Sequence, residues 1–212
     1  MRLGVHALEV GEAVLVHLRR AVAFVVDGMM RTTNIMLGGK KVVVIGYGYC
    51  GQGVAQRLRG LGAHVTVVDT EPMAQLEAHL EGFNVAEKEE ALVGADIVLT
   101  VTGRRNVILE EHFELMKDGV LLCNAGAFEF EIDLSYLRDA AASIRNIRTD
   151  VERISMSDGK NYFLLGRGNS INLAGGDGNP IEVMDLGLAL QALSLERLAL
   201  GTDTLNNEPQ TV

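Results

Sequence analysis

The stretch that decides the fold is Lys41-Val42-Val43-Val44-Ile45-Gly46-Tyr47-Gly48-Tyr49-Cys50-Gly51. Its first five residues form a short β-branched run, which is typical of a strand buried on both faces of a parallel sheet. The glycines follow directly with the spacing GxGxxG, and helical spacing then continues from Gly51 to Leu61. A strand, a glycine-rich turn and a helix in this order predict the start of a dinucleotide-binding unit.

Each glycine of this turn has a physical task. The first permits the tight turn, the second lets backbone approach a pyrophosphate, and the third lets the helix pack closely on the strand. A second buried strand, 64–69, ends at Asp69, 18 residues after Gly51, where a carboxylate can accept hydrogen bonds from the adenosine ribose. That carboxylate would repel the 2′-phosphate of NADP, and neither Thr70 nor Glu71 offers a compensating cation. The sequence therefore favours NAD.

The alternation of strands and helices continues along the chain. We expect helices at 72–80 and 110–116, strands at 97–100 and 120–123, a hairpin formed by 153–156 and 161–165, a glycine-rich loop at 166–179 and a final helix to about 200. This pattern predicts an α/β fold, a Rossmann-type doubly wound parallel sheet, with an N-terminal helix and a C-terminal helix packing outside the core. The predicted divisions are an N-terminal helical segment at 1–36, an NAD-binding domain at 37–200 and a flexible tail at 201–212.

Small polar residues follow two of the predicted strands. Thr100-Val101-Thr102-Gly103 closes one of them, and Asn124-Ala125-Gly126 closes the next. Ligands of open α/β sheets bind outside the carboxyl ends of the strands, so we expect both segments to line the nicotinamide side of the cleft. The alternative is that Thr100, Thr102 and Asn124 merely cap the strand ends.

Several motifs, in order, resemble the NAD-binding domain of the S-adenosylhomocysteine hydrolase family. Besides the glycine turn and the two strand-end segments, they are Asp27-Gly28-Met29-Met30-Arg31-Thr32-Thr33-Asn34, His112-Phe113-Glu114-Leu115-Met116-Lys117-Asp118, Phe128-Glu129-Phe130-Glu131-Ile132-Asp133, Asn172-Leu173-Ala174, Val183-Met184-Asp185 and Gln191-Ala192-Leu193-Ser194. The resemblance covers roughly residues 25 to 200. Consecutive motifs in matching order are far more specific than a glycine pattern alone.

The resemblance implies a tightly held NAD that oxidises the 3′-hydroxyl of a substrate ribose. The ketone acidifies the 4′ carbon, a thiol or water is exchanged at the 5′ carbon, and the cofactor returns the hydride. The predicted cofactor-binding residues are Gly46, Tyr47, Gly48, Tyr49, Cys50, Gly51, Asp69, Thr100, Val101, Thr102, Gly103, Asn106, Asn124, Ala125, Gly126 and Asn172.

The chain also departs from the family. Only about 24 residues precede the matched region, so we expect no counterpart of the family's substrate-binding domain and none of its C-terminal extension. Ala127 and Asn179 stand where the family has histidines. Full adenosylhomocysteinase activity is therefore not expected of this chain alone. The catalytic base is unknown, and the candidates are Asp177, Asn179 and Asn124.

The other reactive side chains give less indication of function. Cys50 lies near a predicted helix N-terminus, which would lower the pKa of its thiol, but packing against the sheet is the commoner role. His112 is expected to be structural. Glu129 and Glu131 alternate with phenylalanines, as on the solvated face of an extended segment. None of the five histidines has metal-ligand spacing, so no metal site is predicted.

Composition limits the classes of partner and location. The formal net charge of -9 disfavours nucleic acid, and two widely separated cysteines favour a reducing compartment. The apolar stretch 13–26 is too short and too charged to span a membrane, and no signal peptide is evident, so a cytoplasmic location is expected. An apolar stripe on the N-terminal helix predicts a homo-oligomer; it comprises Val14, Leu18, Val22 and Val25.

Two functions fit these observations. The first is an NAD-dependent oxidoreductase that acts, as an oligomer, on a small secondary alcohol such as a nucleoside. The second is a non-catalytic NAD-binding module, or an excised hydrolase domain that needs a separate substrate domain.

Overall fold

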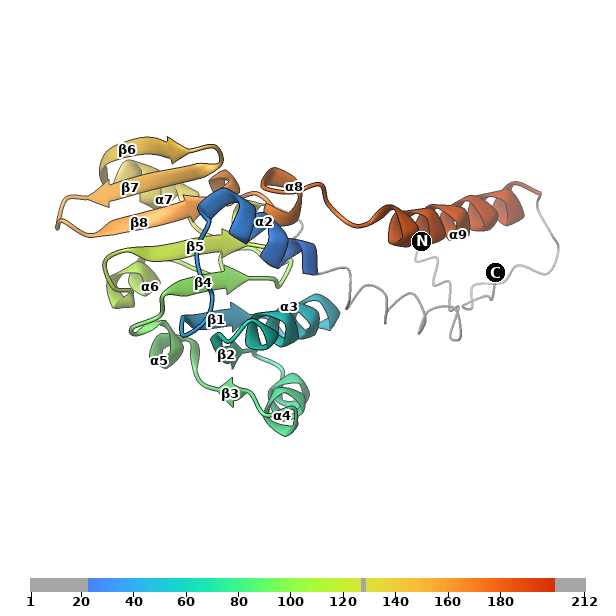
Figure 1. Ribbon diagram of the computed structural model, residues 1–212, viewed down its shortest axis with the longest axis horizontal. Helices are drawn as coiled ribbons and strands as arrows, with labels where there is room; N and C mark the ends of the chain where they lie inside the picture. Colours follow the sequence, from blue (N-terminus) through green and yellow to red (C-terminus); the bar gives the residue numbers. More distant parts are fainter. Residues whose placement is uncertain (1–22, 127–128, 201–212) are drawn as a thin grey trace.

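A computed structural model describes residues 23–126 and 129–200. Within these residues eight strands form one sheet in the order β3-β2-β1-β4-β5-β8-β7-β6 (Figure 1). The strands are β1 (Lys41–Ile45), β2 (His64–Val68), β3 (Asn84–Val85), β4 (Ile97–Thr100), β5 (Val120–Asn124), β6 (Ala141–Arg148), β7 (Val151–Met156) and β8 (Asn161–Leu165). All neighbours from β3 to β8 pair in parallel, whereas β7 and β6 add antiparallel at one edge.

Helices lie on both faces of this sheet (Figure 1). They are α2 (Ala23–Thr33), α3 (Tyr49–Gly60), α4 (Pro72–Leu80), α5 (Lys88–Leu92), α6 (Glu110–Leu115), α7 (Leu134–Asp139), α8 (Ile171–Ala174) and α9 (Ile181–Ala199), with short 3₁₀ turns at η1 (Glu129–Glu131) and η2 (Gly166–Gly168). One buried cluster joins α2 and α3 to the sheet, and a second joins α5, α6 and α7 to the opposite face. The predicted α/β Rossmann-type fold is confirmed.

Strand β1 shows why its β-branched run is central to the fold. Val42 and Val44 belong to the cluster on one face, and Val43 and Ile45 belong to the cluster on the other. Alternate side chains of a strand point to opposite faces, so a strand covered on both sides needs apolar residues at every position. Its order in the sheet, between β2 and β4, makes the carboxyl end of β1 the topological switch point.

Helix α2 changes the interpretation of the N-terminal segment. Val25, Val26 and Met29 are at most 4% exposed and belong to the cluster on the α3 face. The described part of the predicted N-terminal helix is therefore integral to the core, and the predicted division at residue 36 does not separate it from the domain. Val25 of the predicted interface stripe is buried within its own chain; Val14, Leu18 and Val22 lie outside the described residues.

Several short elements differ from the sequence expectation. No local pattern indicated β3, α5, α7 or β6, which are short, edge-located or largely exposed. The segment predicted as a loop at 166–179 contains η2 and α8. Helix α8 lies directly against α2, where a methyl group on Gly28 would come within 2.5 Å of the Ile171 carbonyl oxygen. Helix α8 is too short for a sequence pattern to indicate, and its close packing against α2 defines it.

Helix α9 matches the predicted C-terminal helix, but it lies apart from the sheet (Figure 1). None of its residues is buried. Its exposed large apolar side chains are Ile181, Met184, Leu186, Leu188, Leu193, Leu195 and Leu198. The predicted tail at 201–212 falls outside the described residues. No helix within the described ranges combines the length and the apolar character needed to cross a bilayer.

Candidate functional site

The glycine turn between β1 and α3 is shaped by close backbone contacts. Gly46 has a φ of 104°, in the region that favours glycine, and a methyl group there would lie 2.9 Å from the Val101 carbonyl oxygen. A methyl group on Gly51 would lie only 2.0 Å from the Gly46 carbonyl oxygen. Gly48 differs from both, because a methyl group there would meet nothing within 4 Å. The turn is closed at Gly46 and Gly51 and open at Gly48.

Asp69 stands beside this opening. Its carboxylate accepts a hydrogen bond from the backbone N–H of Tyr47 at 2.6 Å and another from that of Glu71 at 2.9 Å. These bonds fix the carboxylate at the end of β2, next to the glycine turn. At the N-terminus of α3 the N-cap is Gly48, which provides no side-chain cap. A helix N-terminus without a side-chain cap, facing open space, is suited to an anion such as a pyrophosphate.

Tyr47 contributes backbone rather than a side chain to this opening. Its ring is 1% exposed, and its hydroxyl donates a hydrogen bond to the Glu81 carboxylate at 3.0 Å. Burial, followed by the hydrogen bond to Glu81, raises the pKa of the hydroxyl. The next predicted residue, Tyr49, is half exposed in the first turn of α3.

The structure contradicts both sequence interpretations of Cys50. The residue is exposed, so it does not pack against the sheet. Partial desolvation by the surrounding protein raises the pKa of its thiol, so the expected lowering by the helix N-terminus is also wrong. Cys50 is thus an exposed thiol in the first turn of α3 whose pKa lies above its usual value.

Two of the strand-end residues are buried and bonded to protein. Thr100 and Asn124 are both 0% exposed. The Thr100 hydroxyl donates to Asn124 Oδ1, which also accepts from the Gly126 N–H at 2.7 Å, while Asn124 Nδ2 donates to the Gly168 carbonyl at 2.9 Å. These contacts correspond to the alternative of strand-end capping. Asn124 joins β5 to η2 and has no exposed surface with which to act on a substrate.

Glu131 differs most from its sequence interpretation. Instead of lying on a solvated face, it is 0% exposed, in the turn η1, whereas Glu129 is exposed. Its carboxylate accepts hydrogen bonds from the Thr102 N–H at 3.0 Å, the Thr102 hydroxyl at 2.8 Å and the Gly103 N–H at 2.7 Å. The segment after β4, predicted to face the nicotinamide, is therefore bound to this carboxylate.

The remaining predicted residues lie around the same end of the sheet. The half-buried Val101 follows β4, and its backbone N–H donates to Ile45 of β1 at 2.9 Å. Asn106 is exposed with a φ of 59°. Asn172, in α8, accepts a hydrogen bond from the Ser170 hydroxyl at 2.6 Å, and Ser170 itself pairs with Asn124. Residues after β1, β4, β5 and β8 are thus brought together at one edge.

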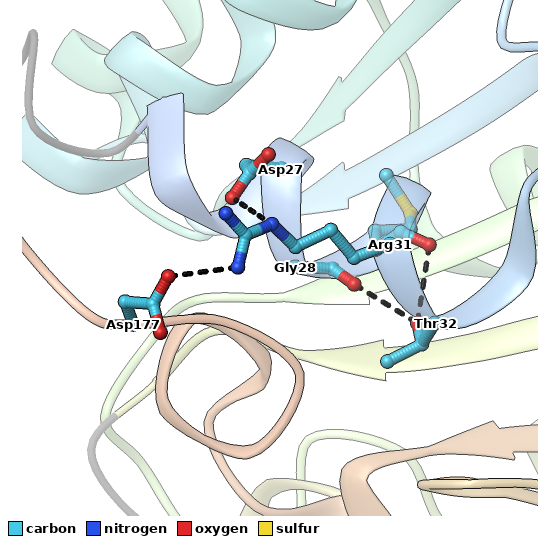
Figure 2. Close-up of polar contacts among 6 residues, drawn as sticks. Asp27, Gly28, Arg31, Thr32 and Asp177 are labelled. Carbon is cyan, nitrogen blue, oxygen red and sulfur yellow. Dashed lines mark hydrogen bonds and ion pairs between the residues drawn. The ribbon is translucent and has the colours of Figure 1, made fainter.

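The catalytic candidates in the last loop have other partners. Figure 2 shows Asp177 facing Arg31 of α2, with 2.8 Å between Oδ2 and the guanidinium, which also pairs with Asp27 at 3.0 Å. The hydrogen bond with Asp177, then the charge of Asp27, raise the pKa of Arg31. The Asn179 amide contacts the Met184 sulfur at 3.9 Å. No contact among the described residues directs the Asp177 or the Asn179 side chain toward the open side of Gly48.

His112 has the structural role expected of it. It is 4% exposed, and its Nδ1 accepts a hydrogen bond from the Leu109 N–H at 2.8 Å, which caps the N-terminus of α6. Burial lowers the pKa of the imidazole, with a further contribution from Lys88. Among the described residues, no cluster of three or more His, Cys, Asp or Glu side chains is placed to hold a metal.

This geometry fits a dinucleotide. The open side of Gly48 leaves room for a pyrophosphate, Asp69 stands where an adenosine ribose would lie, and the segments after β4 and β5 extend the edge toward a nicotinamide. The residues that would hold NAD come from a continuous edge of the sheet rather than from scattered positions.

Comparisons with known proteins agree with this geometry. A family model described as "S-adenosyl-L-homocysteine hydrolase, NAD binding domain" matches residues 19–178. An S-inosyl-L-homocysteine hydrolase from Methanopyrus kandleri is 51% identical over 174 residues, which are 82% of this chain and 41% of that protein. An adenosylhomocysteinase from Nostoc sp. is 47% identical over 172 residues, 81% of this chain and 40% of that protein. The chain thus spans about 40% of the length of these relatives, and the resemblance predicted from the sequence is confirmed.

Solved structures support the fold. A dipicolinate synthase from Bacillus subtilis superimposes with a TM-score of 0.61 at 13% identity, over 88% of this chain and 56% of that one. The corresponding dipicolinate synthase from Bacillus halodurans gives a TM-score of 0.54 at 17% identity, over 60% of this chain and 45% of that one. At such identities the likeness concerns the fold alone.

Proposed function

The chain belongs to the family of S-adenosyl-L-homocysteine hydrolase NAD-binding domains, so NAD is its cofactor, and on this premise we propose how it holds NAD and what it does with it. The pyrophosphate lies over Gly48 at the N-terminus of α3. Asp69 accepts hydrogen bonds from the adenosine ribose. The nicotinamide half lies along 101–103 and 125–126, with Asn106 and Asn172 at its border. The observation that carries this proposal is the contrast between the open side of Gly48 and the closed contacts of Gly46 and Gly51.

The proposed activity is oxidoreduction of a secondary alcohol, with a nucleoside ribose hydroxyl as the substrate class. When bound, NAD supplies a hydride acceptor at its nicotinamide ring. The protein's own residues orient the cofactor, and the substrate's proton acceptor comes from a second copy of this chain that closes over the cofactor. The support for this second copy is the state of the catalytic candidates, because Asn124 is buried and hydrogen-bonded to Gly168 and Gly126, and Asp177 is paired with Arg31.

The same observation favours a second candidate function. A polypeptide whose catalytic candidates Asn124 and Asp177 are engaged in contacts with protein, and which spans about 40% of the length of its relatives, fits a cofactor-binding module that has no activity by itself. Such a module becomes active only when a separate substrate-binding domain is supplied.

One set of assays separates these functions. Mass spectrometry of the purified protein and calorimetric titration with NAD test the cofactor site, and absence of both bound and titratable NAD would refute it. Formation of NADH from a nucleoside by the chain alone supports the oxidoreductase. Activity that appears only after a substrate-binding domain from a relative is added supports the module.

We further propose that the chain is a homo-oligomer in the cytoplasm. The N-terminal stripe that first predicted an interface lies largely outside the described residues, but α9 presents seven large apolar side chains and buries none of its residues. An isolated helix of this length is marginal in water, and an identical helix of a second copy offers a matching apolar cover. Light scattering at micromolar concentration tests this proposal, and a monomer would refute it.

A further inference from the structure

Glu131 carries an inference that goes beyond the family assignment. It is a carboxylate with no exposed surface, and it accepts hydrogen bonds from three uncharged donors, the Thr102 N–H, the Thr102 hydroxyl and the Gly103 N–H. A buried carboxylate is costly unless its oxygens are hydrogen-bonded. Here each oxygen is bonded to the same short segment after β4, so the carboxylate determines the direction in which that segment runs.

Glu131 also contacts the segment after β5. A methyl group on Gly126 would lie 1.6 Å from Glu131 Oε1, so the carboxylate occupies the space that a side chain at 126 would need. Gly126 is in turn held by its N–H bond to Asn124 Oδ1. The two segments expected to line the nicotinamide therefore meet at one carboxylate.

The backbone of Glu131 strengthens the same connection. Its carbonyl oxygen accepts hydrogen bonds from the Val107 N–H at 2.8 Å and the Ile108 N–H at 2.9 Å. The residue thus binds both ends of the loop that runs from Thr102 to Ile108. The loop itself abuts the glycine turn, because a methyl group on Gly46 would lie 3.1 Å from Thr102 Cγ2.

We propose that Glu131 is a positioning residue, whose buried carboxylate fixes the segments at 101–103 and 125–126 in the arrangement that receives the nicotinamide half of NAD. It does not touch the adenosine half, whose proposed contacts are the glycine turn and Asp69. The inference rests on the proposed placement of NAD. It predicts a selective effect, since loss of Glu131 weakens binding of a ligand that has a nicotinamide but not of one that lacks it.

ADP and NAD together provide the test. ADP has the adenosine and both phosphates but no nicotinamide, so it probes only the half of the site formed by the glycine turn and Asp69. The variant Glu131→Gln keeps the shape of the side chain but replaces one acceptor oxygen by an N–H donor, which must face a backbone N–H of Thr102 or Gly103. From the typical strength of hydrogen bonds to charged groups, we expect calorimetry to show roughly 10–100-fold weaker NAD binding and less than about twofold change for ADP.

The matched control is Glu129→Gln, which removes an exposed carboxylate from the same 3₁₀ turn and is expected to leave both affinities unchanged. If Glu131→Gln weakens ADP and NAD equally, or neither, the positioning role is refuted. Should that variant fail to fold, Thr102→Val decides, because it removes the hydroxyl that donates to Glu131 at 2.8 Å and accepts from the Arg104 N–H at 3.0 Å, and leaves both backbone donors to the carboxylate in place. A selective loss of NAD binding in Thr102→Val supports the inference, and an equal or absent effect overturns it.

The wild-type titrations keep this inference separate from the proposed function. If the wild-type chain binds neither ADP nor NAD, the cofactor site itself is refuted and the inference falls with it. If it binds both and Glu131→Gln shows no selectivity, the cofactor site stands and only the role of Glu131 is rejected.

Discussion

Replacing Gly51 by alanine should damage the fold, whereas the same change at Gly48 should damage only cofactor binding. A methyl group on Gly51 would lie 2.0 Å from the Gly46 carbonyl oxygen and 2.8 Å from its carbonyl carbon. Ordinary contact begins near 3.4 Å, so the helix and the turn would have to separate by more than an ångström. Both partners in this contact are backbone, and neither can move aside by changing a rotamer.

The size of the effect follows from the cost of overpacking. Such insertions usually cost about 1–3 kcal/mol, and a clash between two backbones belongs near the upper value, ~3 kcal/mol. For a domain of this size 1 kcal/mol corresponds to roughly 2–4 °C in Tm, so we expect Gly51→Ala to lower Tm by about 6–12 °C. Thermal melts followed by circular dichroism measure this shift.

Gly48→Ala is the matched control. The residue has a φ of -71° and a ψ of -173°, which alanine adopts without strain, and the added methyl meets nothing within 4 Å. Its Tm should therefore stay within about 2 °C of the wild type. The methyl would project into the space proposed for the pyrophosphate, so NAD affinity should fall at least about tenfold, as expected where close backbone approach to the pyrophosphate needs glycine.

Two results would refute this reasoning. A Gly51→Ala variant that melts with the wild type would show that the close contact between the helix and the turn is not a constraint. A Gly48→Ala variant that binds NAD as tightly as the wild type would show that the open side of Gly48 is not where the pyrophosphate lies.

Three further predictions concern single side chains. Burial lowers the pKa of His112, so the unfolded chain takes up a proton before the folded chain does as pH falls below about 6.5, and the free energy of unfolding should fall by up to about 1.4 kcal/mol per pH unit. Urea unfolding at pH 7 and 5.5 measures this dependence, which His112→Gln should reduce; an unchanged dependence would contradict the assignment. Asp177→Asn breaks an exposed ion pair with Arg31, so Tm should stay within about 2 °C, and a larger drop in a thermal melt would show a structural role that the geometry does not indicate. Tyr47→Phe removes the hydroxyl that donates to Glu81, so denaturant unfolding should show a loss of about 1 kcal/mol, and no loss would mean that this bond contributes nothing.

Local sequence patterns predicted the elements that carry the cofactor site. The β-branched run of β1 and the glycines that follow it are signals contained within a few residues. A strand covered on both faces and a turn with positive φ each restrict directly which residue types can occupy them. The helix and strand that lead to Asp69 were predicted for the same reason. The local patterns did not predict short elements such as β3 and α8, because these elements are defined by contacts with residues distant in the chain.

Glu131 illustrates the limit of such patterns. The alternation of phenylalanine and glutamate at 128–131 suggested the solvated face of an extended segment, but Glu129–Glu131 is a 3₁₀ turn. Burial of the carboxylate depends on donors at Thr102 and Gly103, which lie 29 and 28 residues earlier in the chain, respectively. No periodicity within the segment can reveal partners at that distance.

The sequence by itself determined the class of fold, the cofactor and the position of the glycine turn, since these depend on residue types whose conformational limits are local. The tertiary structure decided which polar residues near the carboxyl ends of the strands are exposed, as Asn106 is, and which are buried, as Asn124 and Glu131 are. Asn124 became structural once its partner Gly168 was in place, Asp177 was engaged in an exposed ion pair with Arg31, and Glu131 became the link between two segments of the site. The physical reason is that burial and hydrogen bonding are fixed by contacts between distant parts of the chain, and those contacts exist only after the sheet has formed.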